Sequence, residues 1–568
     1  MKKKKIISLV LVITFILSLT LAGCGSSTPE KPTNQPAPTQ RPSTNKPNSS
    51  GGVSWDSGDL NISDSGTVGS TGSQGGLDWS FGDLALSTES SFSDDYQFNT
   101  SEYDAVKESN FLSTKTSPLS TFAADVDTAS YTNLRAILMD KAGEYSYYTE
   151  TVHDVRIEEM LNYFDYNFKG ETKEVFTVST EISQTPWNPD TQLLVVNIKA
   201  KELPKEEHEG SNLVFLVDTS GSMDNELKLP LLIDSLELLV EELTEKDTIS
   251  IITYASNDRV VLEGASGNEK EKIIAALREL EAYGSTNGEG GLKKAYEIAK
   301  KYKDDHSNSR IIMCSDGDLN VGMSSTSDLM DFVEKKRKDG IYLSVLGFGL
   351  GNYKDNKMET LADNGNGNYH YIDCAEEGRK VLVEDLMSTL VTLADDVKFQ
   401  IEFNPEFIKG YRKIGYENRN LANEDFNDDT KDGGEVGYGH EITIVYEIVP
   451  VNSALEISES DLKYQNNTTS NSKDWCSLSI RYKPHGKWNS KLLEYTIDES
   501  NYSETPSADW KFISDVVGFG LIVNESNYIG DLTLNDIIID LYGIELDDNY
   551  KEEFFSLVKK YQRYSEYQ

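Results

Sequence analysis

The chain has 568 residues, of which 54 are Lys or Arg and 95 are Asp or Glu, so its formal charge is −41. This charge argues against a protein that binds nucleic acid or anionic lipid electrostatically, because both would repel it. Four cysteines are too few for a disulfide framework. The motifs H-E-x-x-H, G-x-S-x-G, C-x-x-C, G-x-G-x-x-G and the Walker P-loop do not occur, so the sequence favours binding over catalysis.

A basic stretch at residues 2–5 precedes an apolar run at 6–21, which ends in Leu-Ala-Gly and Cys24. This arrangement resembles a bacterial lipoprotein signal, in which the cysteine is diacylated and becomes the new N-terminus. The alternative is an uncleaved transmembrane helix, since 18 residues would span about 27 Å. We predict a signal peptide at 1–23 and a lipid anchor at Cys24, with the rest of the chain on the extracytoplasmic face of the cell membrane.

Residues 24–101 consist mainly of Ser, Thr, Gly, Pro, Asn and Asp. Such a segment buries too little apolar surface to offset the entropy lost on ordering, so we predict a disordered tether. Two segments inside it, Gly51–Leu60 and Gly75–Leu84, are similar and place Trp55 and Trp79 at equivalent positions. Two interpretations stay open. The repeat is either a duplicated spacer or a pair of partner-docking motifs with aromatic anchors.

Between residues 210 and 395, short apolar segments alternate with amphipathic ones. The predicted strands are 213–217, 249–254, 311–314 and 341–348, and the predicted helices are 229–243, 271–280, 291–302 and 327–338. This alternation predicts an α/β fold with a doubly wound, mostly parallel, Rossmann-like sheet that carries helices on both faces.

The segments on either side predict smaller modules. Residues 102–205 combine helical periodicity with two later strand patterns, which indicates an N-terminal α+β module. Residues 396–568 carry strand patterns followed by helical ones at 509–524 and 535–564, which indicates a β-rich C-terminal module with terminal helices. The sequence leaves open whether Cys374 and Cys476 form a disulfide.

Oxygen-bearing side chains lie directly after two of the predicted strands and in one further loop. Asp218, Ser220 and Ser222 come at the end of the first strand, Thr286 lies in a later loop, and Asp316 follows the third strand. Ligands of a doubly wound sheet bind at the carboxyl ends of its strands. Carboxylate and hydroxyl oxygens prefer Mg²⁺, Mn²⁺ or Ca²⁺ over zinc or copper. The alternative for Asp-x-Ser-x-Ser alone is a turn with capping hydroxyls.

The five residues together resemble the metal-ion-dependent adhesion site of von Willebrand factor type A (VWA) domains. The resemblance implies that Ser220 and Ser222 bind the metal directly, while Asp218, Thr286 and Asp316 bind directly or through water. Mg²⁺ is the cation that we expect, with Mn²⁺ and Ca²⁺ as alternatives.

Segments outside the site extend the resemblance. Residues 120–131, 155–164 and 411–419 resemble the modules that flank the VWA domain in a bacterial subfamily of lipoproteins. The resemblance implies a membrane-anchored extracytoplasmic protein, without enzymatic activity or catalytic residues. Its metal would bind a protein partner that offers an acidic side chain. The alternatives are an envelope assembly factor in a permanent metal-supported complex, and an unrecognised hydrolase.

Two other acidic segments are weaker candidates for a cation site. Asp125 and Asp127 precede a predicted helix, and a helix cap at Asp127 or Thr128 explains them more simply. The cluster around Asp425 lacks the glycine and the glutamate that an EF-hand needs, so we expect a solvated loop there.

Overall fold

The computed structural model describes residues 105–139, 152, 154–285, 288–304, 308–317, 326–350, 353–458 and 472–566. The predicted signal peptide and tether, together with Cys24, Trp55, Trp79 and Thr286, lie outside these residues. Within the described part, no helix combines the length and the apolar character needed to cross a membrane.

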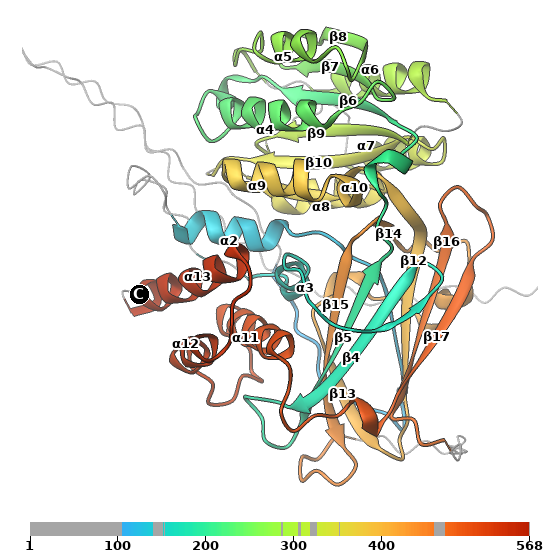
Figure 1. Cartoon of the computed structure of the whole chain (residues 1–568), viewed down its shortest axis with the longest axis vertical. Helices are drawn as coiled ribbons and strands as arrows, with labels where there is room; N and C mark the ends of the chain where they lie inside the picture. Colours follow the sequence, from blue (N-terminus) through green and yellow to red (C-terminus); the bar gives the residue numbers. More distant parts are fainter. Residues whose placement is uncertain are drawn as a thin grey trace, which may run out of the picture. The chain divides into compact units, whose positions relative to one another are not determined.

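A six-stranded sheet forms the centre of the α/β domain, in the order β11-β10-β9-β6-β7-β8 (Figure 1). Its strands are β6 (Ser211–Asp218), β7 (Thr248–Tyr254), β8 (Arg259–Ser266), β9 (Asn308–Ser315), β10 (Tyr342–Phe348) and β11 (Tyr369–Ile372). The β7–β8 pair is antiparallel, and the other pairs of this sheet are parallel. Strand β6 is buried along its whole length, as expected for a central strand covered on both faces.

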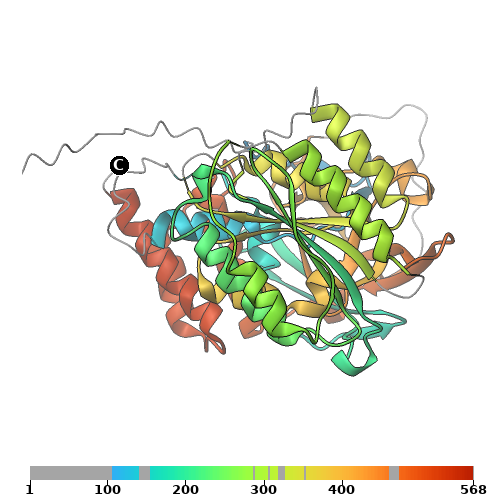
Figure 2. The same cartoon turned by 90° about the horizontal axis from the view of Figure 1, so that it is seen from above.

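Helices cover both faces of this sheet (Figure 2). They are α4 (Leu229–Glu242), α5 (Lys270–Leu277), α6 (Gly288–Tyr302), α7 (Thr326–Arg337), α8 (Asp355–Asn364), α9 (Ala375–Arg379) and α10 (Leu386–Leu390). Successive residues of β6 point to opposite faces. Phe215 therefore packs in one core with α4 and α5, whereas Leu216 packs in another with α6, α7 and α8. The predicted doubly wound, mostly parallel fold is confirmed.

Two further sheets pack face to face as a β-sandwich around a common apolar core. One has the order β1-β13-β15-β5-β4-β3, and the other has the order β14-β12-β16-β17 with β2 beside β12. The strands before the α/β domain are β1 (Leu112–Ser113), β2 (Leu119–Ala123), β3 (Glu171–Lys173), β4 (Phe176–Gln184) and β5 (Gln192–Ala200). Those after it are β12 (Thr392–Phe403), β13 (Ile408–Ile414), β14 (Gly434–Gly437), β15 (Glu441–Pro450), β16 (Cys476–Pro484) and β17 (Lys491–Ile497).

The segments before and after the α/β domain meet within both sheets of the sandwich. Strand β5 pairs antiparallel with β15, with Val195 opposite Val445. Strand β2 pairs antiparallel with β12, with Phe122 opposite Phe399. The two flanking segments thus complete each other, which their local sequence patterns do not indicate.

A helical layer packs on the outer side of the sandwich. Its helices are α2 (Ala129–Met139), α3 (Ile157–Leu161), α11 (Ala508–Val523), α12 (Leu534–Gly543) and α13 (Asn549–Glu566). Their apolar core includes Met160, Phe512 and Phe554 and reaches β5 through Leu193. The pattern predicted at 535–564 corresponds to two helices, since α12 ends at Gly543.

The three described cysteines, Cys314, Cys374 and Cys476, are buried, and no disulfide joins them. The disulfide left open for Cys374 and Cys476 is therefore absent from this structure. Burial raises the pKa of the Cys314 and Cys476 thiols, which keeps both protonated and unreactive.

Candidate metal centre

Four of the five predicted metal residues are described, and they lie at one edge of the sheet. Asp218 is the last residue of β6, Ser220 follows it, and Ser222 belongs to the short 3-10 turn Gly221–Met223. Asp316 directly follows β9. Because β6 and β9 are parallel neighbours, their carboxyl ends meet at this edge.

The Asp218 carboxylate is buried and accepts two hydrogen bonds. The Ser220 amide donates to Oδ1 at 2.8 Å, and the Ser315 hydroxyl donates to Oδ2 at 3.4 Å. Burial raises the pKa of Asp218 to about 6, and the charge of Asp316 adds to this effect, while the Ser220 N–H opposes it. A cation beside Asp218 would favour the charged carboxylate, which suits a metal ligand.

The two serine hydroxyls lie side by side. Ser220 Oγ and Ser222 Oγ are 3.0 Å apart, and Ser220 is buried whereas Ser222 is exposed. Adjacent ligands of an octahedral Mg²⁺ ion, each about 2.1 Å from the metal, are about 3 Å apart. The two hydroxyls share a hydrogen bond, and the same distance suits neighbouring ligands of one ion.

The loop that leads to Thr286 is fixed beside the serine turn. The Gly221 amide donates to Gly284 O at 3.0 Å, and the Tyr283 amide donates to Thr219 O at 2.8 Å. Gly284 has a φ of +83°, a conformation that favours glycine. Thr286 itself lies outside the described residues, so its ligand role stays a prediction.

Asp316 pairs with a lysine that the sequence pattern did not single out. Lys228 Nζ lies 2.9 Å from Asp316 Oδ2, and the two side chains are 13% and 3% exposed. Lys228 directly precedes α4, so it approaches from the segment after the serine turn. A lysine at the start of an amphipathic helix is ordinary, and nothing in the sequence links it to Asp316.

Within the described ranges, no three His, Cys, Asp or Glu side chains are grouped so that they could hold a metal ion. The candidate centre therefore depends on serine hydroxyls as well as two carboxylates. Such hard oxygen donors suit Mg²⁺, Mn²⁺ and Ca²⁺. The residues present fit a divalent cation of this class.

The other acidic segment near the α/β domain binds an arginine. Arg419 Nε lies 2.9 Å from Asp125 Oδ2, and its Nη2 lies 3.5 Å from Asp127 Oδ2. Asp127 Oδ1 also accepts the Tyr369 amide at 2.8 Å, which joins this segment to β11. These contacts account for both carboxylates without a metal ion.

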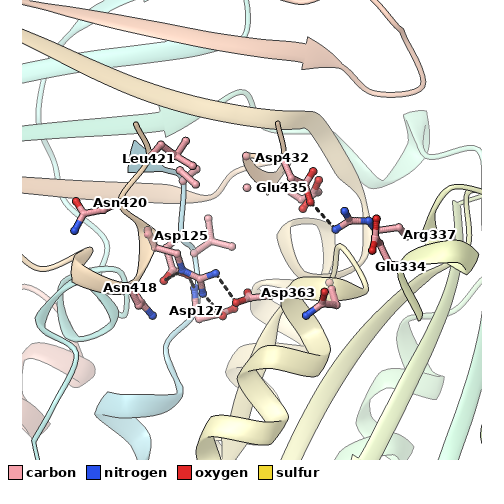
Figure 3. Close-up of a pocket in the computed structure, with 18 residues that line it drawn as sticks. Asp125, Asp127, Glu334, Arg337, Asp363, Asn418, Asn420, Leu421, Asp432 and Glu435 are labelled. Carbon is pink, nitrogen blue, oxygen red and sulfur yellow. Dashed lines mark hydrogen bonds and ion pairs between the residues drawn. The ribbon is translucent and has the colours of Figure 1, made fainter. Parts of the chain in front are cut away.

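A polar cavity of about 340 Å³ lies between the α/β domain and the sandwich (Figure 3). Asp363 of α8 and Arg337 of α7 line one side, and Asp432 lies opposite them. Arg337 pairs with Asp432, and Arg419 Nη1 lies 2.6 Å from Asp363. The cavity is thus a charged junction in which both of these arginines are paired with carboxylates.

Three family models match the chain. The von Willebrand factor type A domain matches residues 212–385, a model described as von Willebrand factor matches 97–195, and one described as "Uncharacterized protein YfbK, C-terminal" matches 388–564. The chain therefore carries a VWA domain between the flanking segments, and proteins with VWA domains typically mediate protein interactions.

A relative from Escherichia coli strain K12, "Uncharacterized protein YfbK", is 38% identical over 473 residues, which cover 81% of each chain. A solved von Willebrand factor type A protein from Catenulispora acidiphila is 16% identical, with a TM-score of 0.36, over 61% of this chain and 78% of its own. Proximal thread matrix protein 1 from the mussel byssus, solved with a zinc-occupied metal-ion-dependent adhesion site, is 17% identical, with a TM-score of 0.27, over 33% of this chain and 46% of its own. VWA domains often hold a divalent cation at this site.

Proposed function

This chain belongs to the family of the Escherichia coli protein YfbK, and we propose that it binds a protein partner through a divalent cation held by its VWA domain. The cation would be held by Asp218, Ser220, Ser222, Thr286 and Asp316. The partner contributes an acidic side chain to an open coordination position. The cation supplies the positive charge that lets one carboxylate approach a chain with a net charge of −41.

The observation that supports this function best is the pair of serine hydroxyls, 3.0 Å apart, beside the buried Asp218 carboxylate. Asp218 Oδ1 caps the turn by accepting the Ser220 N–H, whereas Oδ2 accepts the longer hydrogen bond from the Ser315 hydroxyl, at 3.4 Å. A shell of so few protein oxygens leaves positions for water and for a partner.

Mg²⁺ is the ion that we propose for the centre. Mg²⁺ prefers an octahedral shell and keeps several of its water molecules, so a few protein oxygens are enough to hold it. A retained water leaves a position that the carboxylate of a partner can take. Mn²⁺ has the same preference for oxygen ligands and is the natural substitute.

We also propose that a lipid on Cys24 attaches the chain to the extracytoplasmic face of the cell membrane. The basic stretch and the apolar run that end at Cys24 support this anchor. The tether at 24–101 would then let the VWA domain reach partners away from the membrane surface. Trp55 and Trp79 are candidate anchors for a second contact with the partner.

Surface crosslinking in Mg²⁺ and in EDTA, followed by identification of the captured protein, tests the function. Wild type is expected to capture its partner in Mg²⁺ and to lose it in EDTA. Asp218→Ala should fail to capture it in either buffer. Asp234→Ala removes an exposed carboxylate from α4 of the same domain, so it should behave as wild type.

Two outcomes would favour other functions. Capture that persists in EDTA and in Asp218→Ala would indicate a permanent envelope complex that does not depend on the metal. Release of soluble products from purified cell-wall polymer by the wild-type protein would indicate a hydrolase.

A further inference from the structure

We propose that Lys228 is a built-in cation that competes with the divalent ion for Asp316 and thereby sets the metal affinity of the centre. This inference rests on the proposed metal-dependent function and adds to it a residue outside the five predicted ligands. It follows from the position of the lysine, the path of its side chain and the charge that it meets.

The aliphatic part of the Lys228 side chain packs against Gly349. Gly349 follows β10 with a φ of +76°, and a Cβ atom at this position would lie 2.3 Å from Lys228 Cε and 2.6 Å from its Cγ. The aliphatic chain of Lys228 therefore lies against the backbone of Gly349, and a side chain at position 349 would displace it. The side chain is 13% exposed, unlike a lysine that extends freely into solvent.

In this position the Lys228 ammonium group contacts Asp316, one of the candidate metal ligands. Lys228 Nζ lies 2.9 Å from Asp316 Oδ2. Asp218 and Asp316 are both buried, so water screens neither charge well. The ammonium group offsets part of the negative charge that these two residues place at one edge of the sheet.

A divalent ion at the same edge would compete with this ammonium group. If Asp316 binds the ion directly through Oδ2, the ion and the Lys228 ammonium group contact the same oxygen atom and repel each other. Ligation through a water molecule still leaves the ion and the ammonium group close enough to repel each other. In either case, removal of the ammonium charge strengthens metal binding and leaves more net negative charge at the centre when no metal is bound.

The test compares Lys228→Met, Lys228→Arg and the control Lys270→Met with wild type. Methionine keeps an unbranched stem over Gly349 and loses the charge, whereas arginine keeps the charge. Lys270 pairs with Glu241 near the opposite end of α4. Mg²⁺ affinity is measured by titration calorimetry, and the thermal midpoint of unfolding is measured in EDTA.

We expect Lys228→Met to bind Mg²⁺ at least about tenfold more tightly than wild type. Its midpoint in EDTA should fall below that of Lys270→Met, because the buried carboxylates of Asp218 and Asp316 lose the charge of Lys228. Lys228→Arg and Lys270→Met should bind Mg²⁺ within about threefold of wild type.

The outcomes separate this inference from the function on which it rests. If wild type and Lys228→Met bind Mg²⁺ equally, Lys228 does not compete with the metal ion, and the proposed function stands. If Lys228→Met binds Mg²⁺ and wild type does not, the competition is supported and metal-dependent binding by wild type is overturned. If neither protein binds Mg²⁺ or Mn²⁺, both proposals are overturned.

Discussion

Arg156 Nη1 lies 2.8 Å from Asp355 Oδ2, and this contact joins the segment before the VWA domain to the first residue of α8. The same guanidinium pairs with Glu159 through Nε, and its Nη1 lies 3.3 Å from Glu359 Oε2. None of these side chains is more than 11% exposed. A buried ionic network therefore connects the VWA domain to its flanking segments.

Loss of this arginine is expected to destabilise the whole chain. Arg156→Gln should lower the free energy of unfolding by about 3–5 kcal/mol, because buried carboxylates lose their counter-charge. Urea denaturation measures the change. Arg278→Gln is the control, because Arg278 also pairs with a carboxylate, Glu237, but its side chain is 67% exposed. This variant should lower the free energy of unfolding far less. Equal losses in the two variants would show that the Arg156 network contributes no more than a surface pair.

Substitution of the strand-end carboxylate tests the metal centre directly. Asp218→Asn should weaken Mg²⁺ binding by more than the roughly 10- to 100-fold that loss of an outer-shell partner costs. The amide oxygen can still accept the Ser220 N–H, so the turn should keep its shape. In EDTA the variant should melt no lower than wild type, because a buried charge beside Asp316 is removed. Calorimetry that gave equal Mg²⁺ affinities would refute the assignment of Asp218.

A buried carboxyl group on α11 is expected to control how stability depends on pH. Asp515 is 5% exposed, and its Oδ2 has no hydrogen-bond partner within the described part of the chain. Burial, and secondly the charge of Asp540, raise the pKa of Asp515 to about 9. The unfolded chain releases this proton near pH 4. The folded protein therefore binds more protons between these values, and its stability falls as the pH rises.

Asp515→Asn removes this titration. The variant should unfold with a higher free energy than wild type at pH 8, and the difference should grow from pH 5 to pH 9 by up to about 1.4 kcal/mol per pH unit. Urea denaturation at several pH values in this range measures it. Asp531→Asn changes an exposed residue and should follow wild type throughout. A constant difference across the range would show that Asp515 does not titrate there.

The lipid anchor is tested by the loss of its thiol. Cys24→Ser should either leave the membrane fraction or retain its uncleaved signal, because serine cannot accept the lipid. The acidic chain offers no electrostatic attraction to anionic headgroups that could replace the lipid. Cell fractionation combined with intact mass measurement distinguishes these states. A variant of mature mass that still sediments with the membrane would exclude the lipid as the anchor.

The twin segments of the tether are tested by removal of their aromatic residues. If they dock to the partner, the Trp55→Ala and Trp79→Ala double variant should bind it at least about tenfold more weakly. Each single variant should show a smaller loss, because the remaining copy keeps a raised effective concentration. Binding titrations with and without Mg²⁺ measure both effects. A double variant that matches wild type in both buffers would identify the repeat as a spacer.

The predicted fold was confirmed where strands are buried on both faces. The apolar runs of β6 and β9 end in Asp218 and in Ser315 followed by Asp316, so the sequence itself places these side chains at strand ends. Strand β8 was not predicted, because it lies at the sheet edge and its exposed residues do not alternate with buried ones. Lys228 was missed because its partner is 88 residues away. Local patterns also contain no information on which distant strands pair, and so the shared sandwich was not expected.

The pairing of β5 with β15 has a consequence for how the chain folds as it is synthesised. Lys199 of β5 lies opposite Glu441 of β15, with the entire VWA sheet between them in the sequence. The VWA domain can complete its own sheet early. Strand β5, in contrast, keeps one edge unpaired until β15 has been synthesised. Such long-range pairing is slow, and an open strand edge is a template for aggregation. A chain that stops after the VWA domain would keep this edge open permanently.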